Sequence, residues 1–312
     1  MARPKVDLRK IKTIPLDGRK CKVSLKEFAR VAPKGSSFKN FYEALPDVLA
    51  AKDLRALVDA VVAAYKKKRM VILMMGAHVI KCGLSPLVID LMKRGVVKAV
   101  ALNGAGIIHD TEIAMIGRTS EDVGEGIVDG SFGMARETAK FINEAINRGF
   151  QKGLGIGEAL GEKIVKAKLP HKDMSILAAG YERNIPVTVH VAIGADIIHQ
   201  HPSANGEAIG EGSLLDFKTF IYSVTALEGG VAINFGSAVI LPEVFLKAVT
   251  VARNLKSTPK VFTTANFDMI NQYRPRQNIL SRPTSTGGRG YNIIGHHEIM
   301  IPLLYRAIIE NI

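Results

Sequence analysis

The chain has 312 residues, of which 47% are hydrophobic and 23% charged, and a formal net charge of +13. This composition is that of a globular protein and not of a disordered or membrane one, and no apolar run reaches the length of a bilayer span. The two cysteines, Cys21 and Cys82, cannot form a disulfide framework and lack metal-binding spacing. Since no apolar segment typical of a secretory signal follows the basic N-terminus, we expect a cytoplasmic protein without membrane contact.

The positive charge could attract nucleic acid, an anionic cofactor or an acidic protein. The Lys and Arg residues are spread along the chain, however, with a single run from Lys66 to Arg69. Aromatic residues are sparse and no RNA-binding motif is present. We therefore expect a dinucleotide or a protein partner rather than nucleic acid.

Residues 1–36 are expected to form an N-terminal arm, and residues 37–312 a single α/β domain. In the arm, Asp17-Gly18 is a hairpin-turn signal, and Ser24 to Glu27 form a capping box that opens a short helix. Within the domain, residues 118–184 show mostly helical patterns joined by glycines, which predicts a helical insertion.

The segment from residue 71 to residue 102 predicts a strand, a helix and a second strand. Residues 71–75 and 96–102 are uninterrupted apolar runs, which are typical of strands covered on both faces. Between them, residues 84–94 place apolar side chains three and four positions apart, as on one face of a helix. A βαβ unit of this kind implies a parallel sheet with right-handed crossovers.

Later parts of the chain continue this alternation. Three further strands are predicted, at residues 185–192, 231–234 and 261–265. Three further helices are predicted, one from the capping box Ser213 to Asp216, one from Pro242 to Asn254 and one from His297 to Ile309. The segment from Tyr273 to Tyr291 is expected to be a loop. The alternation predicts a doubly wound, mainly parallel, Rossmann-like sheet with helices on both faces.

In such a sheet, ligands bind beyond the carboxyl ends of the strands. Two of these ends consist of small residues that let a ligand approach the backbone closely, Gly76-Ala77-His78 and Asn103-Gly104-Ala105-Gly106. The second turn is followed by His109, Asp110 and Glu112, more titratable groups than helix capping requires. A third turn, Glu228-Gly229-Gly230, precedes Asn234 and Ser237, which can hydrogen-bond at a strand end. We predict the ligand site among these residues.

Seven of the eight histidines occur at predicted strand ends or in small-residue turns, namely His78, His109, His190, His199, His201, His296 and His297. His109 and His199 are the candidates to accept a proton, because histidine titrates near neutral pH. An alternative is that Asp196, His199 and His201 bind the metal of a hydrolase, because two histidines two positions apart on a strand face the same side.

The segment Ser281 to Gly290 could act as a mobile lid, as an anion-holding loop through Arg282 and Arg289, or as a simple connector. A serine-hydrolase elbow, a Walker loop and a kinase motif set are all missing from the sequence.

The pieces of this chain, in their order, resemble deoxyhypusine synthase. Ala105 to Asp110 is similar to the A-G-G-[VI]-E-E-D turn of that family, which there also follows a strand, a small-residue turn and a helix. Asn184 to Val187 looks like its N-I-P-V strand, Glu228 to Val231 like its G-G-G-V turn, and His297 to Leu304 like its closing helix with P-L-L. The resemblance runs from about residue 40 to the end, and the chain is identified as a divergent member.

This resemblance implies a doubly wound domain that binds NAD at the strand ends and assembles as a homotetramer with sites between subunits. The family oxidises spermidine with NAD and passes an aminobutyl group through a lysine imine to a lysine of a protein acceptor. By position, NAD contacts would come from the first two turns and from Asp110, Asp196, Gly229, Gly230 and Ser237. The amine or polyamine substrate would contact Glu112, His201, Glu228 and His296.

The chain departs from the family at the covalent step. Asn278 to Gly290 contains neither the tryptophan nor the lysine of the family's lysine motif, and Asn234 replaces a histidine. Ile108 and His109 replace two carboxylates. The catalytic candidates are the titrating residues His109 and His199, together with Asn234. The sequence thus predicts an NAD-dependent, amine-oxidising or aminoalkyl-transferring enzyme. The metal hydrolase and a non-catalytic NAD-binding protein are the alternatives.

Overall fold

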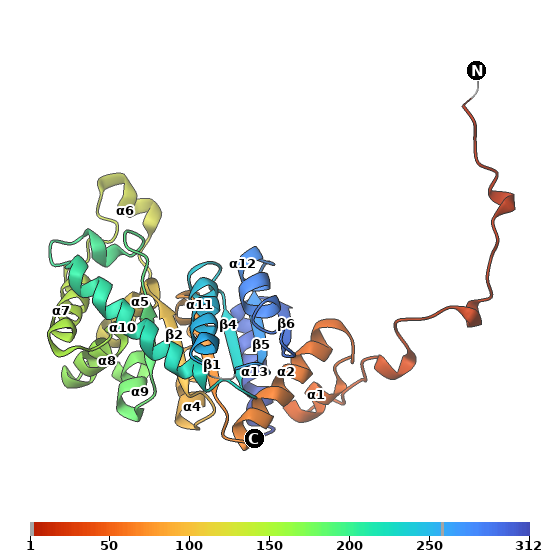
Figure 1. The fold of residues 1–312 in the computed structure, drawn as a ribbon, viewed down its shortest axis with the longest axis horizontal. Coiled ribbons are helices and arrows are strands. Elements are labelled where there is room, and N and C mark those ends of the chain that lie inside the picture. The colour runs from red at the N-terminus through yellow and green to blue at the C-terminus, as the bar shows by residue number, and fades with distance from the viewer. Residues whose placement is uncertain (1–2, 257–258) are drawn as a thin grey trace.

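A computed structural model describes residues 3–256 and 259–312. Within them the chain forms one six-stranded, all-parallel sheet in the order β3-β2-β1-β4-β5-β6 (Figure 1). The strands are β1 Val71–Met75, β2 Ala99–Asn103, β3 Val187–His190, β4 Val231–Phe235, β5 Thr263–Asp268 and β6 Arg289–Ile294. The predicted fold class, a doubly wound α/β sheet, is confirmed.

The central strands are buried because their sequences are apolar on both faces. All five residues of β1 and of β4 are buried, and these two strands pair directly, with Leu73 opposite Ile233. On its other side β1 pairs with β2. Side chains that alternate along β1 therefore enter two separate cores, one on each face of the sheet.

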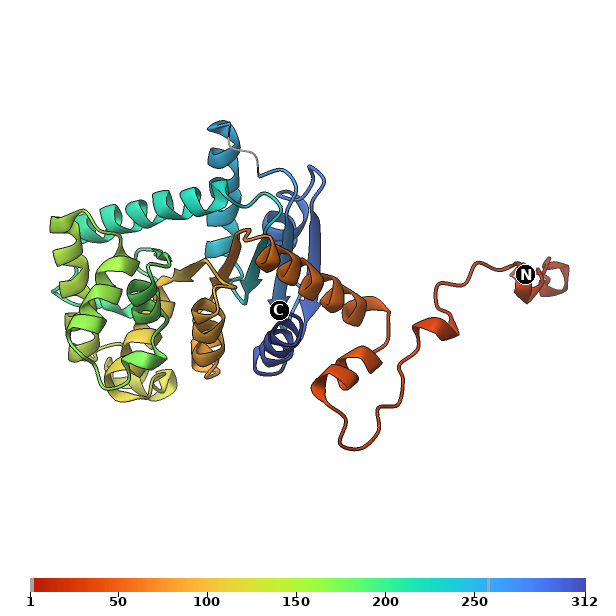
Figure 2. The same cartoon turned by 90° about the horizontal axis from the view of Figure 1, so that it is seen from below.

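Helices cover both faces of the sheet. The larger core lies under helices that include α2 Leu49–Lys66, α4 Ser85–Lys93, α5 Gly104–Ile116 and α13 His297–Ile309. The smaller core lies under α11 Ile240–Asn254 and the C-terminal half of α10 Gly206–Thr225. Figure 2 shows α10 and α11 on one side of the sheet and α4 and α13 on the other.

The remaining described elements are short or lie at the ends of the molecule. Before the sheet comes α1 Phe38–Ala44, and α3 His78–Lys81 follows β1 directly. A helical group beside β2 and β3 comprises α6 Val123–Asp129, α7 Arg136–Lys152, α8 Ile156–Lys166 and α9 Ile176–Arg183 (Figure 1). The 3₁₀ turns are Leu8–Lys10, Leu16–Gly18, Leu25–Glu27, Lys172–Met174 and Ile197–Gln200, and α12 Tyr273–Pro275 leads into a π-helical turn, Arg276–Ser281.

Three details of the prediction are wrong. The helix α10 begins at Gly206, capped by Asn205, and not at Ser213, whose hydroxyl instead donates to the carbonyl of Val189 at 3.3 Å. Asp17-Gly18 lies in a 3₁₀ turn rather than a hairpin. The strand β6 begins within the segment expected to be a loop, because its sequence is mostly exposed and lacks an apolar run.

The N-terminal arm trails away from the sheet in Figures 1 and 2. Its apolar side chains are exposed, for example Leu8, Ile14 and Val31. Residues 1–36 contain 11 of the 42 Lys and Arg residues and 3 of the 29 acidic ones, so the positive charge is less evenly spread than expected. None of the helices in residues 3–256 and 259–312 combines the length and the apolar character needed to cross a membrane.

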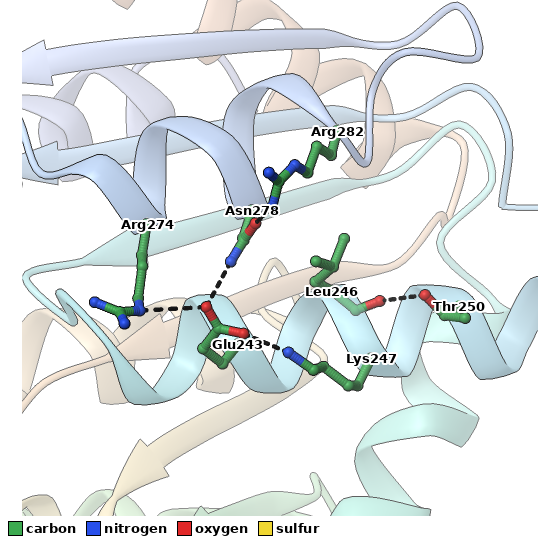
Figure 3. Close-up of polar contacts among 7 residues, drawn as sticks. All are labelled: Glu243, Leu246, Lys247, Thr250, Arg274, Asn278 and Arg282. Carbon is green, nitrogen blue, oxygen red and sulfur yellow. Dashed lines mark hydrogen bonds and ion pairs between the residues drawn. The ribbon is translucent and has the colours of Figure 1, made fainter.

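Glu243 of α11 anchors the start of the segment from Asn278 to Gly290, which was compared above with the lysine motif of deoxyhypusine synthase. This carboxylate accepts a hydrogen bond from Asn278 Nδ2 at 2.8 Å and pairs with Arg274 at 3.3 Å and with Lys247 (Figure 3). Arg282 in turn donates to Asn278 Oδ1 at 2.7 Å. The charges of this cluster are therefore used to join α11 to the π-helical turn.

The loop after this turn lies at the amino end of β6, away from the carboxyl ends of the strands. Thr286 donates its hydroxyl hydrogen to the carbonyl of Lys260 at 2.6 Å, and Arg253 donates to the carbonyl of Pro283 at 2.7 Å. Of the roles considered for Ser281 to Gly290, the geometry supports the connector and contradicts a lid over the carboxyl edge.

Candidate functional site

The carboxyl edge of the sheet contains a topological switch point between β1 and β4. From β1 the chain moves to β2 on one side, and from β4 it moves to β5 on the other, which is where open α/β sheets bind ligands. Gly76 and Gly236 meet there, since a Cβ on Gly76 would lie 3.1 Å from the carbonyl oxygen of Gly236. Two glycines leave this crossing free of side chains, with Ala77 and His78 beside it at the start of α3.

His297 covers the β4 side of this crossing. Gly236 has a positive φ of 65°, and a Cβ on it would lie 2.5 Å from Cε1 of the His297 ring. His297 Nε2 lies 3.2 Å from the carbonyl oxygen of Phe267, and burial lowers the pKa of this histidine. His297 was not selected from sequence, because its neighbours give no sign that α13 returns to the middle of the sheet.

The next turn along the edge starts α5. Asn103, the last residue of β2, accepts a hydrogen bond from the Gly106 amide at 3.0 Å and so caps the helix. Gly104 and Gly106 are buried and Ala105 is half-buried. A Cβ on Gly104 would overlap the carboxylate of Asp196, so this glycine is what lets Asp196 reach the start of the helix.

Asp196 is 8% exposed and its Oδ2 has no hydrogen-bond partner within the described residues. Burial raises the pKa of this carboxyl to about 6. An unpartnered buried acceptor costs free energy, on the order of 1 to 3 kcal/mol. Asp196 is therefore poised to accept a hydrogen bond from a ligand.

His109, Thr119 and Glu112 form a relay on α5 and the segment that follows it. The Thr119 hydroxyl donates its only hydrogen to Glu112, so it must accept from His109 Nδ1, which lies 2.6 Å away. The proton on Nδ1 leaves Nε2 as the basic nitrogen of His109. Burial lowers the pKa of His109 although Glu112 raises it, so the ring is neutral and able to accept a proton.

A surface hollow adjoins this relay. Glu112 and Thr119 line it together with Glu121, Glu137 and one cation, Arg118, and its apolar wall includes Met115, Ile116 and Ala135. Glu112 also accepts a hydrogen bond from the Thr138 hydroxyl at 3.1 Å. Carboxylates next to apolar side chains suit a ligand that carries ammonium groups on a methylene chain.

His199 is placed as a hydrogen-bond donor and not as a base. Its Nδ1 accepts from the Gly194 amide at 3.2 Å, so Nε2 carries the hydrogen, and this buried atom has no partner within the described residues. His201 Nε2 lies 2.8 Å from the carbonyl oxygen of Gly133 and anchors the loop there. The expected role of His201 in substrate binding has no support in this contact.

Asp196, His199 and His201 do not form a metal set. In residues 3–256 and 259–312, the one trio of His, Cys, Asp or Glu whose ligand atoms all lie within 4.8 Å of one another is His78, Cys82 and Glu298. The hydrolase alternative based on Asp196, His199 and His201 is therefore wrong. A short strand would have aligned the two histidines, but they lie in and after a 3₁₀ turn.

Asn234 belongs to a row of amides across three strands. Its Nδ2 donates to Asn266 Oδ1 at 2.7 Å and to the Ser237 carbonyl at 3.0 Å, and Asn266 donates to Asn292 at 3.1 Å. Asn234 Oδ1 has no partner among the described residues. The Ser237 hydroxyl accepts from the Leu241 amide at 3.2 Å at the start of α11, so it is already engaged in capping.

Several expected site residues have other roles. Asp110 is fully buried and binds the start of α9, since it accepts from the Ile176 amide at 2.8 Å and from the Ser175 hydroxyl at 2.5 Å. Its expected contact with NAD is therefore contradicted. Glu228, Gly229 and Gly230 precede β4 and lie at the opposite, amino edge, where Glu228 accepts from the Lys260 and Val261 amides. They cannot join a ligand at the carboxyl edge.

His296 is exposed and caps α13, with Nδ1 3.8 Å from Glu298 Oε1. His190 is buried at the end of β3, where burial lowers its pKa to about 3 and its Nε2 lies 3.0 Å from the Thr188 hydroxyl. Cys82 and Glu298 were not predicted as site residues. The spacing of His78 and Cys82, four apart, would have placed them on one face of a helix.

No protein-family model matches the chain, and no curated protein matches it in sequence. Solved structures share its fold at low identity. A provisionally named LOR/SDH protein from Methanococcus maripaludis S2 has a TM-score of 0.52 at 15% identity, covering 85% of this chain and 71% of its own.

Two other structures widen this comparison. AgrE in a ternary complex with ornithine and NAD⁺ has a TM-score of 0.53 at 16% identity, over 84% of this chain, which spans only 34% of AgrE. A provisionally named deoxyhypusine synthase from Entamoeba histolytica has a TM-score of 0.51 at 10% identity, covering 89% of this chain and 94% of its own. At these identities the likeness shows the shared fold alone.

Proposed function

We propose that this protein is an NAD-dependent enzyme that oxidises a polyamine such as spermidine, or a related primary amine, in the manner of deoxyhypusine synthase-like proteins. The observation that carries the proposal is the His109–Thr119–Glu112 relay beside a hollow with three glutamates and an apolar wall. The relay offers a neutral base, and the hollow offers the charge and surface that a polyamine needs. The shared fold with an NAD-binding protein supports the choice of cofactor.

The residues at the carboxyl edge fit a dinucleotide. Asp196 follows β3 in the chain, but its carboxylate lies against Gly104, the residue after β2, where dinucleotide-binding domains hold a ribose hydroxyl with an acidic residue. Its Oδ2 is a buried acceptor without a partner among the described residues. Because a carboxylate at the start of α5 repels phosphate, Gly76, Ala77 and His78 are the proposed phosphate contacts. Asn234 Oδ1 and His199 Nε2 supply a further acceptor and a further donor at this edge.

The proposed oxidation converts an amine to an imine. Bound NAD would accept the hydride from the carbon next to the nitrogen. The nitrogen must lose a proton as its bond to carbon becomes double, and His109 Nε2 is the proposed acceptor of that proton. Glu112 holds Thr119 and thereby the tautomer of His109, while Glu121 and Glu137 attract the other ammonium groups of the substrate.

NAD binding and amine oxidation can be tested in turn on the full chain. NAD is titrated by calorimetry, and NADH fluorescence is then followed with spermidine and shorter diamines. We expect Asp196→Asn to weaken NAD binding, and Glu112→Gln to lower kcat/KM for the amine at least about tenfold with NAD affinity kept. The control is Glu228→Gln, at the opposite edge, which should change neither quantity.

Two results would count against parts of this proposal. NAD binding without turnover of any amine would indicate the non-catalytic NAD-binding protein, and no NAD binding would overturn the proposal as a whole. The homotetramer and the protein acceptor are further parts of the proposal. Native mass spectrometry with and without NAD tests the tetramer, and transfer of radiolabel from spermidine to protein tests the acceptor.

A further inference from the structure

A histidine, a cysteine and a glutamate from two distant parts of the chain meet beside the switch point. His78 is the first residue of α3, Cys82 follows one helical turn later, and Glu298 lies in the first turn of α13. One ligand atom of each lies within 4.8 Å of the other two. None of these atoms takes part in the relay or in the amide row described above.

The backbone holds this trio in place. The Cys82 amide donates to the His78 carbonyl at 2.9 Å, so both side chains lie on the same face of a helical turn. The buried side chains of Ile301 and Leu304 anchor α13 in the larger core and bring Glu298 to this face. The positions of the three side chains therefore follow from buried packing, although His78 and Glu298 are themselves exposed.

The contacts among these three side chains contribute little to the stability of the fold. Cys82 Sγ lies 3.9 Å from Glu298 Oε2, which is a weak contact. Burial and the carboxylate of Glu298 raise the pKa of Cys82. A thiol beside a carboxylate is unfavourable for the thiolate unless a cation lies between them, and the fold does not depend on this contact.

We propose that His78, Cys82 and Glu298 bind a divalent transition-metal ion of the zinc class. Nitrogen, sulfur and oxygen donors are the ligands zinc takes, at about 2.0 to 2.3 Å from the ion. Three ligand atoms around one ion lie about 3 to 4 Å apart, so a small change of side-chain rotamers closes the set. Binding releases the thiol proton of Cys82 to solvent, without oxidation or reduction. Three protein ligands leave a position open for water or a substrate atom.

The metal proposal does not rest on the proposed NAD chemistry, although His78 is also one of the residues proposed to contact the NAD phosphates. The site lies at the same edge of the sheet, because His78 follows the Gly76 turn, and His297, next to Glu298, covers Gly236. The His78 and His297 ring centroids are 5.9 Å apart. An ion with an open position here would lie where ligands of parallel sheets bind.

Cobalt and zinc titrations of the full chain, purified with a chelator and then freed of it, test the proposal. Cobalt bound to a thiolate gives a charge-transfer band in the near ultraviolet, which identifies Cys82 as a ligand directly. We expect one ion per chain. We also expect the band to disappear in Cys82→Ser, and zinc affinity to fall at least about 100-fold in Cys82→Ser and Glu298→Gln.

The chain offers a matched control in Cys21→Ser, since the other cysteine is exposed on the arm and should not affect either metal. Glu298→Gln replaces an exposed side chain, so its loss of affinity cannot be attributed to misfolding if circular dichroism is unchanged. The proposal is overturned if no ion binds, if the cobalt band survives Cys82→Ser, or if it is lost in Cys21→Ser. Failure of the NAD proposal would leave these outcomes unchanged.

Discussion

The carboxylate of Asp196 occupies the space that a side chain at Gly104 would fill. These residues are 92 positions apart in sequence, yet their contact decides what lies at the first turn of α5. Glycine at position 104 is required by this neighbour, because the residue is otherwise in an ordinary helical position. The contact leaves one carboxylate oxygen of Asp196 buried and without a partner among the described residues.

Gly104→Ala should displace Asp196 and weaken NAD binding at least about tenfold, as the loss of one charge-assisted hydrogen bond implies. The matched control is Gly210→Ala in α10, where a Cβ meets nothing within 4 Å. The control should stabilise the protein by about 0.5 to 1 kcal/mol, since alanine is the better helix former, with NAD affinity unchanged. Equal NAD affinity in Gly104→Ala would contradict the role of Asp196.

The relay predicts that Thr119→Val lowers kcat for amine oxidation while Thr119→Ser keeps it. Valine has the shape of threonine but cannot join His109 to Glu112, so the basic tautomer of His109 is no longer favoured. A loss of about 10- to 100-fold is expected, the size of a misplaced general base. The pH profile of kcat/KM distinguishes this from a folding defect, because the pKa on its acidic limb should shift in Thr119→Val and stay in place in Thr119→Ser.

Asp110 is predicted to act through stability alone. Asp110→Ala leaves the Ile176 and Leu177 amides at the start of α9 and the Ser175 hydroxyl without this acceptor. A loss of about 2 to 4 kcal/mol in the free energy of unfolding is expected, and urea titration measures it. NAD affinity of the folded fraction should be unchanged. A selective loss of NAD binding at full stability would restore the cofactor role assigned from sequence.

Asp216 should make stability depend on pH. Burial raises its pKa to about 7, although it accepts from the Gly157 and Val189 amides at 3.0 and 2.9 Å. An unfolded aspartate titrates near about pH 3.9, so between about pH 4 and about pH 7 the folded state binds more protons. The contribution of Asp216 to the free energy of unfolding therefore falls as pH rises through this window. A pKa difference of this size corresponds to a change on the order of a few kcal/mol.

The contribution of His190 to the pH dependence of stability has the opposite sign. Burial lowers its pKa to about 3, so between that pH and about pH 6.5 the unfolded state binds more protons. Its contribution to stability rises with pH through that range. Asp216→Asn removes the fall in stability that Asp216 contributes as pH rises. The free energy of unfolding of the variant should therefore increase with pH relative to that of the unsubstituted protein. Denaturant titrations across the window measure both curves. Parallel curves would show that Asp216 has the same pKa in the folded and unfolded states.

The sequence by itself determined the strands whose side chains are apolar on both faces. β1, β2, β4 and the helices α4 and α13 were predicted close to their observed bounds, because burial on a known period leaves a direct pattern in the sequence. The edge strand β6 was missed since an exposed strand has no such pattern. The start of α10 was misplaced because Ser213 and Asp216 resemble a cap while binding backbone atoms of other elements.

Only the tertiary structure decided which polar residues share a site. The sequence pattern grouped Glu228, Gly229 and Gly230 with Gly76 and Gly104, but strand direction puts the first three at the opposite edge. It did not bring Cys82 and Glu298 together, since 216 positions separate them and only the return of α13 across the sheet joins them. Local patterns report burial and backbone conformation, whereas a site depends on contacts between segments whose distance in sequence carries no information about their distance in space.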